Sequence, residues 1–354
     1  MQAIVDYPSL NTAGPGTLIG VSGSVFFMFV TLTFCMSYNK PFLSVHDQVL
    51  LLQARGMDVG SVTHAETLLT QFGYYRLSGY WHPMRKWKIV PDGTVYEDDF
   101  QQGSTLTQAI KLAKFDEDLR ALFLRAVERI EIGLRVRVAL LLGQHGAMAH
   151  RDPKNLYPKF SSTPDPTTGV PPYTTWVNRV DEHEARSKEQ FAVHMRSKYG
   201  LPFPLWVSIE VWDFGMMSRL VSGMTISDLY ALGPQLGMSR KFVIPSWLRA
   251  INHIRNICAH YSRLWNRSPA DQPMPPKLGE DPMLDHLATD SFAQTKLYAV
   301  AAVMQYLLRT IDPAFATEWS NLLKAHFLTF PTKSPFVAEQ SGFPEGWNTL
   351  LLWN

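Results

Sequence analysis

The sequence predicts a mainly α-helical protein, a bundle of four principal helices preceded by an accessory region that contains a short β-hairpin or turn. Three observations lead to this prediction. Apolar residues recur at helical intervals over residues 105–143, and a second amphipathic pattern covers residues 244–265. The Pro-Asp-Gly triplet at residues 91–93 is a turn signal between two β-prone runs.

The individual elements follow in order along the chain. Short helices are expected at residues 44–55 and 63–71, ahead of the hairpin or turn. Thr105 or Thr107 begins the long helix, which ends near Gly143 and Gly146. Residues 151–172 are rich in Pro, Ser and Thr and predict a loop or linker. Further helices are expected at residues 173–198, 205–224, 244–265, 291–310 and 313–327, with a Pro-rich break at residues 268–282.

These elements suggest four regions. Residues 1–36 form an apolar N-terminal extension, and residues 37–103 form the accessory region. The helical bundle is expected at residues 104–311, and a C-terminal helix and tail at residues 312–354.

The N-terminal extension carries no charged residue between Tyr7 and Asn39, and its apolar run at residues 18–36 has about the length of a transmembrane helix. Three interpretations stay open. A signal peptide is disfavoured because no Lys or Arg precedes the run. A membrane anchor would place Lys40 on the cytoplasmic side. We favour the third, in which Met36 is the true start. We therefore expect a cytoplasmic protein, with anchoring to the inner membrane by residues 18–36 as the alternative.

Composition excludes several function classes. The chain has 354 residues, 46% of them hydrophobic, and a net charge of +2, which is ordinary for a globular protein. Cys35 and Cys258 cannot supply a structural zinc site or a disulfide framework, so a reducing compartment is favoured and Cys258 is expected in the core. No phosphate-binding glycine loop or metalloenzyme motif is present, so we expect no metal and no cofactor. Four histidines without metal-ligand spacing are expected at the surface: His145, His150, His183 and His194.

Positive charge that no Asp or Glu offsets is concentrated in one segment. Residues 229–270 contain no Asp or Glu. They carry a cluster of basic and imidazole side chains: Arg240, Lys241, Arg249, His253, Arg255, His260, Arg263 and Arg267. A local cluster of this kind is typical of a surface that faces phosphate, although the chain as a whole is nearly neutral.

Helical spacing divides this segment into two faces. With Ser246 as the N-cap, one face is apolar and is expected in the core: Trp247, Ile251, Ile254, Ile257, Cys258, Tyr261, Leu264 and Trp265. The opposite stripe is polar: Arg249, Asn252, His253, Asn256, His260, Arg263 and Arg267, with Arg255 at its edge.

The chemistry of three residues suggests a catalytic site. The Arg255 guanidinium can bind phosphate oxygens, and the Asn256 amide can orient a substrate by donating and accepting hydrogen bonds. Imidazole is the side-chain type best suited to proton transfer near neutral pH, which makes His260 the candidate general acid or base. A solvated face of an amphipathic helix would show the same basic stripe, and spacing alone favours neither interpretation.

Two further groups have competing interpretations. The aromatic residues around Arg76, at positions 74, 75, 80 and 81, could stack on RNA bases, but aromatic side chains at this density more often build a core. Glu131 and Arg135 are one helical turn apart, with Glu128 on the same face, so an intrahelical ion pair explains them. In the alternative, Glu128 or Glu131 orients Arg255.

The string from Arg255 to His260 resembles the RN-x-x-x-H motif of the HEPN superfamily, and the wider pattern resembles the Abi-like abortive-infection family of bacterial phage-defence proteins. The similar segments extend in order from about Tyr38 to the C-terminus: YNKPFLSVHDQVLLLQARGM, FGYYRLSGYW, ERIEIGLR, PLWVSIEVWDFG, RNICAHYSRLWNR and GFPEGWNTLLLW. The resemblance implies a HEPN-type helical bundle and a metal-independent endoribonuclease that acts as a homodimer.

On this hypothesis RNA is the partner, and Arg255, Asn256 and His260 are the catalytic residues. Arg249, His253, Arg263, Arg267 and Arg76 are then candidate RNA-binding residues, with Glu128, Glu131 and Arg135 as supporting ones. Two alternatives stay open. The chain could be a non-catalytic RNA-binding or regulatory module, or a helical interaction protein associated with a membrane.

Overall fold

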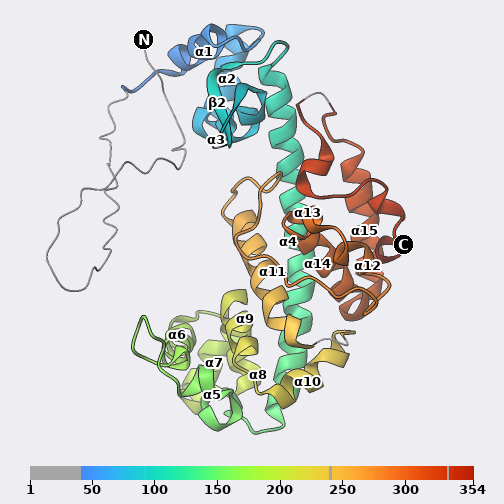
Figure 1. Ribbon diagram of the computed structural model, residues 1–354. Helices are drawn as coiled ribbons and strands as arrows, with labels where there is room; N and C mark the ends of the chain where they lie inside the picture. The colour runs from blue at the N-terminus through green and yellow to red at the C-terminus, as the bar shows by residue number, and fades with distance from the viewer. Residues whose placement is uncertain (1–40, 92, 239–240, 333–334) are drawn as a thin grey trace, which may run out of the picture. The chain divides into compact units, whose positions relative to one another are not determined.

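The computed structural model describes residues 41–354 except residues 92, 239–240 and 333–334. The described chain is mainly helical, and its one sheet has two antiparallel strands (Figure 1). The predicted fold class, mainly α with a short β-hairpin, is therefore confirmed. The N-terminal extension and all interpretations of it lie outside the described residues. No helix in the described part of the chain combines the length and the apolar character that crossing a membrane requires.

Contacts divide the chain into two units, residues 1–113 and residues 114–354. The described part of the first unit begins with α1 (Val45–Ala54), whose N-cap Ser44 accepts a hydrogen bond from the Asp47 amide. Helices α2 (Val62–Phe72) and α3 (Tyr74–Trp81) follow, and β1 (Arg85–Val90) pairs with β2 (Gly93–Phe100) across the predicted turn.

The aromatic run of the first unit forms helix α3. Its Tyr80 and Trp81 are 2% and 1% exposed, and the Trp81 ring packs edge-on against Phe100 with ring centroids 6.5 Å apart. Burial of each such side chain stabilises the fold by roughly 1.5–3 kcal/mol. The core interpretation therefore holds for these two residues, whereas Tyr75 and Arg76 are exposed.

Helix α4 (Leu106–Gly143) crosses the boundary between the units. It begins as predicted, because Thr105 and Gln108 exchange hydrogen bonds in a capping box: each side chain accepts from the other residue's amide at 3.1 Å. Buried residues recur every three or four positions along α4. The helix ends at Gly143, also as predicted.

The first part of the second unit differs from the sequence prediction in three places. Residues 151–172 contain a short helix, α5 (Pro158–Ser161). The single helix expected at residues 173–198 is two helices, α6 (Pro172–Arg186) and α7 (Gln190–Tyr199). The helix expected at residues 205–224 is also divided, into α8 (Leu205–Ser208) and α9 (Phe214–Ser222).

The division before α9 has a local cause. The Asp213 side chain accepts a hydrogen bond from the Met216 amide at 2.9 Å and so caps α9, which requires an extended backbone at Asp213. Helix α10 (Ile226–Gln235), which was not predicted from the sequence, follows with Thr225 as its N-cap.

The rest of the second unit surrounds a buried helix. Helix α11 (Ile244–Ala259) is followed by α12 (Asp285–Ala288) and α13 (Ser291–Gln294), and then by α14 (Leu297–Ile311) and α15 (Pro313–Phe327). The helix expected at residues 291–310 is thus divided into α13 and α14. Helix α14 is buried without interruption from Leu297 to Leu308, so it is the centre of this core. The C-terminal tail packs on the same core through Phe336, Phe343, Trp347 and Trp353.

The expectation of surface histidines is wrong at one position. His150 is fully buried, with its ring centroid 5.7 Å from that of Trp212 and 6.4 Å from that of Trp176. His183 is half-buried, and His145 and His194 are exposed. Spacing identifies apolar positions, but it does not show that an imidazole will lie among tryptophans contributed by other helices.

Candidate functional site

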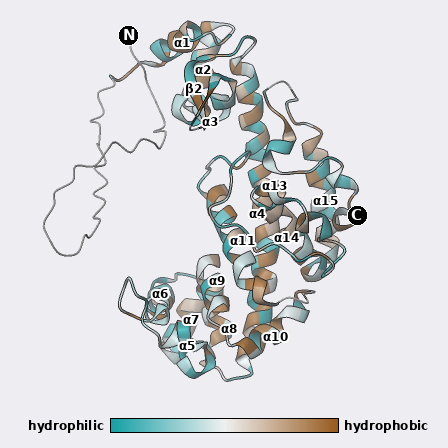
Figure 2. Ribbon diagram, in the orientation of Figure 1, coloured by the Kyte–Doolittle hydropathy of each residue, from teal (hydrophilic) through white to brown (hydrophobic). Residues whose placement is uncertain are grey.

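Helix α11 has the two faces that its sequence predicts. Trp247, Ile251, Ile254, Ile257 and Cys258 are buried. On the other side, Arg249 and Asn256 are exposed, and Asn252 and His253 are half-buried. Hydrophilic and hydrophobic residues accordingly alternate along α11 in Figure 2. The helix therefore presents a polar stripe while its apolar face joins the core.

Both ends of α11 differ from the prediction. The N-cap is Val243, and the buried Ser246 hydroxyl instead accepts a hydrogen bond from the Met274 amide at 2.8 Å. At the other end the helix stops after Ala259, and His260 is the C-cap. The predicted helix over residues 244–265 is thus too long by the segment that follows His260.

Hydrogen bonds at the end of α11 explain why it stops there. The Tyr261 amide donates to the Cys258 carbonyl at 3.1 Å, and the Ser262 amide donates to the Ile257 carbonyl at 3.0 Å. These two bonds form a Schellman motif, in which the residue after the C-cap takes a left-handed conformation. Tyr261 has this conformation, with φ of 57°. The chain then leaves the helix axis, which places Arg263 and Arg267 beyond the helix.

A buried carboxylate holds the segment after the helix. Asp116 of α4 is fully buried and accepts hydrogen bonds from the amides of Leu264, at 3.1 Å, and Trp265, at 2.6 Å. Arg120, one turn along α4, donates to the same carboxylate at 2.5 Å. Leu264 and Trp265 are buried as expected, but from a non-helical segment, whereas Tyr261, expected in the core, is 69% exposed.

Neither Asp116 nor Arg120 was predicted from the sequence to have a role at this site. A signal was present, because Asp116 lies on the apolar stripe of α4, one turn after Leu112. A carboxylate at a core position needs a partner, and Arg120 stands at the correct spacing. The role of Asp116 in binding the segment after α11 has no local signal, because its partners are 148 and 149 residues away.

The three candidate catalytic residues lie at the end of α11. Asn256 and His260 are exposed and one helical turn apart, joined by a hydrogen bond from the His260 amide to the Asn256 carbonyl at 3.0 Å. Arg255 is half-buried, and its Nη1 donates to the Asn256 Oδ1 at 3.3 Å. The structure therefore brings the Arg255 and Asn256 side chains into contact and places Asn256 beside His260 along the helix.

His253 has a different environment from His260. Its Nε2 accepts a hydrogen bond from the Ala270 amide at 3.2 Å, and its Nδ1 lies 4.0 Å from the Asp271 carboxylate. Because Nε2 accepts, the proton of the neutral ring is on Nδ1. His253 thus fastens the loop after the motif to α11. Arg249 is exposed on the helix, and Arg76 belongs to α3 of the first unit.

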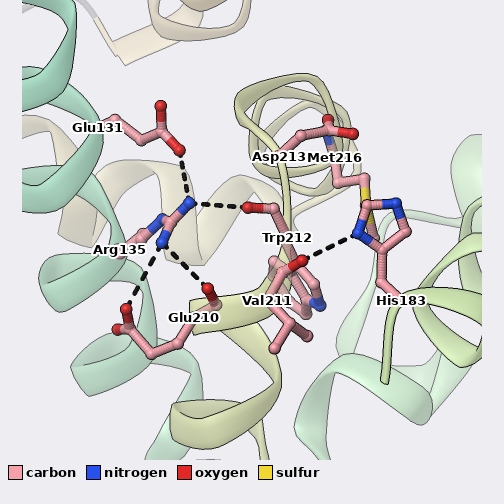
Figure 3. A network of polar contacts seen from close by, with 8 residues as sticks. All are labelled: Glu131, Arg135, His183, Glu210, Val211, Trp212, Asp213 and Met216. Carbon is pink, nitrogen blue, oxygen red and sulfur yellow. Dashed lines mark hydrogen bonds and ion pairs between the residues drawn. The ribbon is translucent and has the colours of Figure 1, made fainter. Parts of the chain in front are cut away.

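Glu131 and Arg135 form the ion pair that their spacing predicts. The Arg135 Nη2 donates to Glu131 at 2.5 Å and to the Trp212 carbonyl at 2.7 Å. Its Nη1 donates to the Glu210 carbonyl at 3.3 Å, and Figure 3 shows the guanidinium between these groups. Glu131 is therefore engaged with Arg135, while Glu128 is exposed on α4. This network joins α4 to the segment before α9.

Burial determines the chemistry of the Cys258 thiol. Cys258 lies in the last turn of α11 and is 1% exposed. Burial, with a smaller contribution from the nearby Asp116 carboxylate, raises the pKa of its thiol to about 12. The thiol is therefore protonated at neutral pH and acts as the small core residue that was predicted. Within the described residues, no group of three or more His, Cys, Asp or Glu side chains is arranged to hold a metal ion.

Comparison with known proteins assigns the chain to a family. A family model described as Abi-like protein matches residues 67–266, more than half of the chain. The chain belongs to the Abi-like protein family. The matched region begins in α2 and ends at Asn266, so it includes α4, α9, α11 and the chain turn after His260.

The family prediction is thus confirmed, over a shorter stretch than the resemblance from about Tyr38 to the C-terminus indicated. Membership makes the function one of the abortive-infection type. No curated protein and no solved structure matches the chain.

Proposed function

We propose that this Abi-like protein is a HEPN-type endoribonuclease whose site is formed by Arg255, Asn256 and His260. The observation that carries the proposal is the exposure of Asn256 and His260, one turn apart, at the end of a helix whose other face is buried. The contact between Arg255 and Asn256 adds a guanidinium to the same place. The chain segment that carries these residues, 229–270, has basic side chains and no Asp or Glu, which favours attraction of a phosphodiester.

The reaction needs one proton removed and one supplied. The RNA 2′-oxygen attacks the adjacent phosphorus while the bond from phosphorus to the 5′-oxygen breaks, which leaves a 2′,3′-cyclic phosphate and a 5′-hydroxyl. His260 accepts the 2′-hydroxyl proton as a neutral imidazole, or donates a proton to the leaving oxygen as an imidazolium. Arg255 stabilises the negative charge that accumulates on the phosphate oxygens, and Asn256 orients the phosphate.

This division of roles favours two copies of the chain. One motif supplies one imidazole, while the reaction uses an acid and a base. A two-fold symmetric homodimer that brings two α11 ends together would supply both. None of these steps requires a metal ion or a cofactor, so we expect cleavage in the presence of excess chelator.

The test compares two histidine variants on structured RNA in excess chelator. His260→Ala should slow cleavage by about 10²–10⁴-fold, the usual contribution of a general acid or base. His194→Ala is the matched control, because His194 is an exposed histidine on α7 and should cleave as the unmodified protein does. Unchanged cleavage by His260→Ala, or loss of cleavage on chelation, would contradict the proposal.

Two further measurements separate the alternatives. If unmodified protein mixed with excess His260→Ala loses more activity than dilution explains, each active dimer needs two copies of His260. If RNA binds with a steep dependence on salt but is never cut, the chain is an RNA-binding module without catalysis.

A further inference from the structure

Tyr261, the residue after His260, has a backbone conformation that disfavours its side chain. Among the described residues, only Tyr261 and Asn266 combine a positive φ with a side chain larger than that of glycine. Asparagine is the non-glycine residue that best tolerates this conformation, whereas tyrosine is strained in it. The position after a helix C-cap is usually glycine for this reason. Tyrosine at this place therefore costs the fold stability.

No contact of the Tyr261 side chain with a described residue offsets this loss of stability. The Tyr261 side chain is 69% exposed, and it makes no hydrogen bond and no ring contact with any described residue. The conformation is nevertheless well determined by its surroundings, through the two bonds of the Schellman motif and the capture of the next segment by Asp116. The strained backbone thus holds an aromatic ring out from the surface at one defined place. Strain that the surroundings maintain is typical of functional positions.

The residues that precede Tyr261 in the chain belong to the candidate site. Tyr261 follows His260 directly, and Asn256 lies one turn before His260. A phosphate bound at Arg255 and His260 would have its attached nucleotide within reach of the next side chain. Exposed aromatic rings bind unpaired bases by stacking, which works for any base because each has a π face.

We propose that Tyr261 is a stacking platform for an unpaired RNA base next to the cleaved phosphate. This inference rests on the proposed function, because it uses the position of the phosphate at His260. It makes single-stranded RNA, or an unpaired loop, the substrate class. A base inside a duplex has both faces covered by its neighbours and cannot stack on the ring.

The test measures binding separately from cleavage. In a His260→Ala background, a labelled single-stranded oligonucleotide gives the Kd without turnover. Tyr261→Asn should raise this Kd about 5-fold to 100-fold, the effect of losing one base-stacking ring. The same variant should leave Tm unchanged or higher, because asparagine tolerates the positive φ. Tyr261→Phe keeps the ring and should keep the Kd.

Tyr199 supplies the matched control. It is 66% exposed at the end of α7, which lies apart from α11 in Figure 1. Tyr199→Asn removes a ring of equal exposure and should leave the Kd unchanged. The effect of Tyr261→Asn should also be larger on the single-stranded oligonucleotide than on a duplex of the same sequence.

Three results would overturn the inference. They are an unchanged Kd in Tyr261→Asn, an equal loss of binding in Tyr261→Phe, and a fall in Tm of several degrees in Tyr261→Asn, which would make the ring structural. Failure of the proposed function looks different. If the oligonucleotide binds through Tyr261 but the unmodified protein does not cut RNA, stacking stands and catalysis is refuted.

Discussion

The second unit contains two groups of arginine, histidine and polar side chains that look alike in the sequence and differ in the structure. Around Arg135, the groups bind one another. The guanidinium donates to Glu131 and to main-chain carbonyls, and the His183 Nδ1 donates to the Val211 carbonyl at 2.9 Å (Figure 3). At the end of α11, Asn256 and His260 point to solvent. Partners within the fold, rather than residue type, separate a structural network from a candidate site.

The Arg135 network has a clear structural role. The carbonyl oxygens of Glu210, Val211 and Trp212 lie where α9 is separated from the preceding helical turn, and they have lost helical partners. Arg135 and His183 supply the missing donors, and Asp213 caps the next helix. Buried main-chain groups must be paired, so these side chains stabilise the break itself.

The largest effect on stability is expected at Asp116, which supports the end of α11. Asp116→Asn should lower the free energy of unfolding by about 3–5 kcal/mol, because a buried ion pair loses one charge. Urea denaturation measures this difference. Asp118→Asn, at an exposed position on the same helix, is the control and should change stability by less than about 0.5 kcal/mol. A loss below about 1 kcal/mol in Asp116→Asn would mean that the segment after α11 is held by other contacts.

A smaller effect on the free energy of unfolding is expected at Arg135. Substitution of Arg135 should leave the proposed RNA cleavage unchanged. Arg135→Ala leaves the carbonyls of Glu210 and Trp212 without their donor, which should lower the free energy of unfolding by about 1–3 kcal/mol. Lys114→Ala, an exposed cation on the same helix, is the control for lost charge. If folded Arg135→Ala lost RNA cleavage, the Arg135 network would be part of the catalytic site, and its contrast with the end of α11 would be wrong.

The smallest effect depends on pH and involves His150. Burial, with a contribution from the positive charge of Arg151, lowers the pKa of His150 from 6.5 to about 3. Below pH 6.5 the unfolded chain therefore takes up a proton that the folded protein does not. Stability is lost as the pH falls from about 6.5 toward 3, at up to about 1.4 kcal/mol per pH unit from this residue.

His150→Phe should remove that part of the pH dependence. The quantity to measure is the change in the free energy of unfolding between pH 7 and pH 5.5, which should be about 1 kcal/mol smaller in the variant. His194→Phe, at an exposed position, should show the change of the unmodified protein. Equal changes in all three proteins would mean that the folded protein stabilises protonated His150, for example through a hydrogen-bond acceptor, so that its pKa is not lowered.

The sequence predicted the elements of the fold better than their ends. Apolar spacing located α4, α11 and α15, because burial on one face imposes a helical period. It extended α11 too far because Leu264 and Trp265 fit that period and are indeed buried. They are buried from a non-helical segment whose amides are bound by Asp116, and a contact between residues so distant in sequence leaves no local pattern.

At the candidate site, too, local features were predicted from the sequence and contacts with distant residues were not. Arg255, Asn256 and His260 form a local string, so their proximity follows from the helix alone. His253 belongs to the same stripe, but a loop amide occupies its Nε2, which spacing cannot reveal. Tyr261 was expected in the core by extrapolation of the helix to residue 265. The Schellman motif reverses that expectation, because it ends the helix at Ala259 and turns the chain at Tyr261.

The buried thiol of Cys258 allows the opening of the last turn of α11 to be measured directly by chemical modification. It sits in the last helical turn before His260, and in the folded protein it is both shielded and protonated. An alkylating or disulfide reagent can modify it only when that turn frays or the whole unit unfolds. With Cys35 replaced by serine, the modification rate would report how often the end of α11 opens. If RNA binds at this end of α11, as proposed, it should slow the modification.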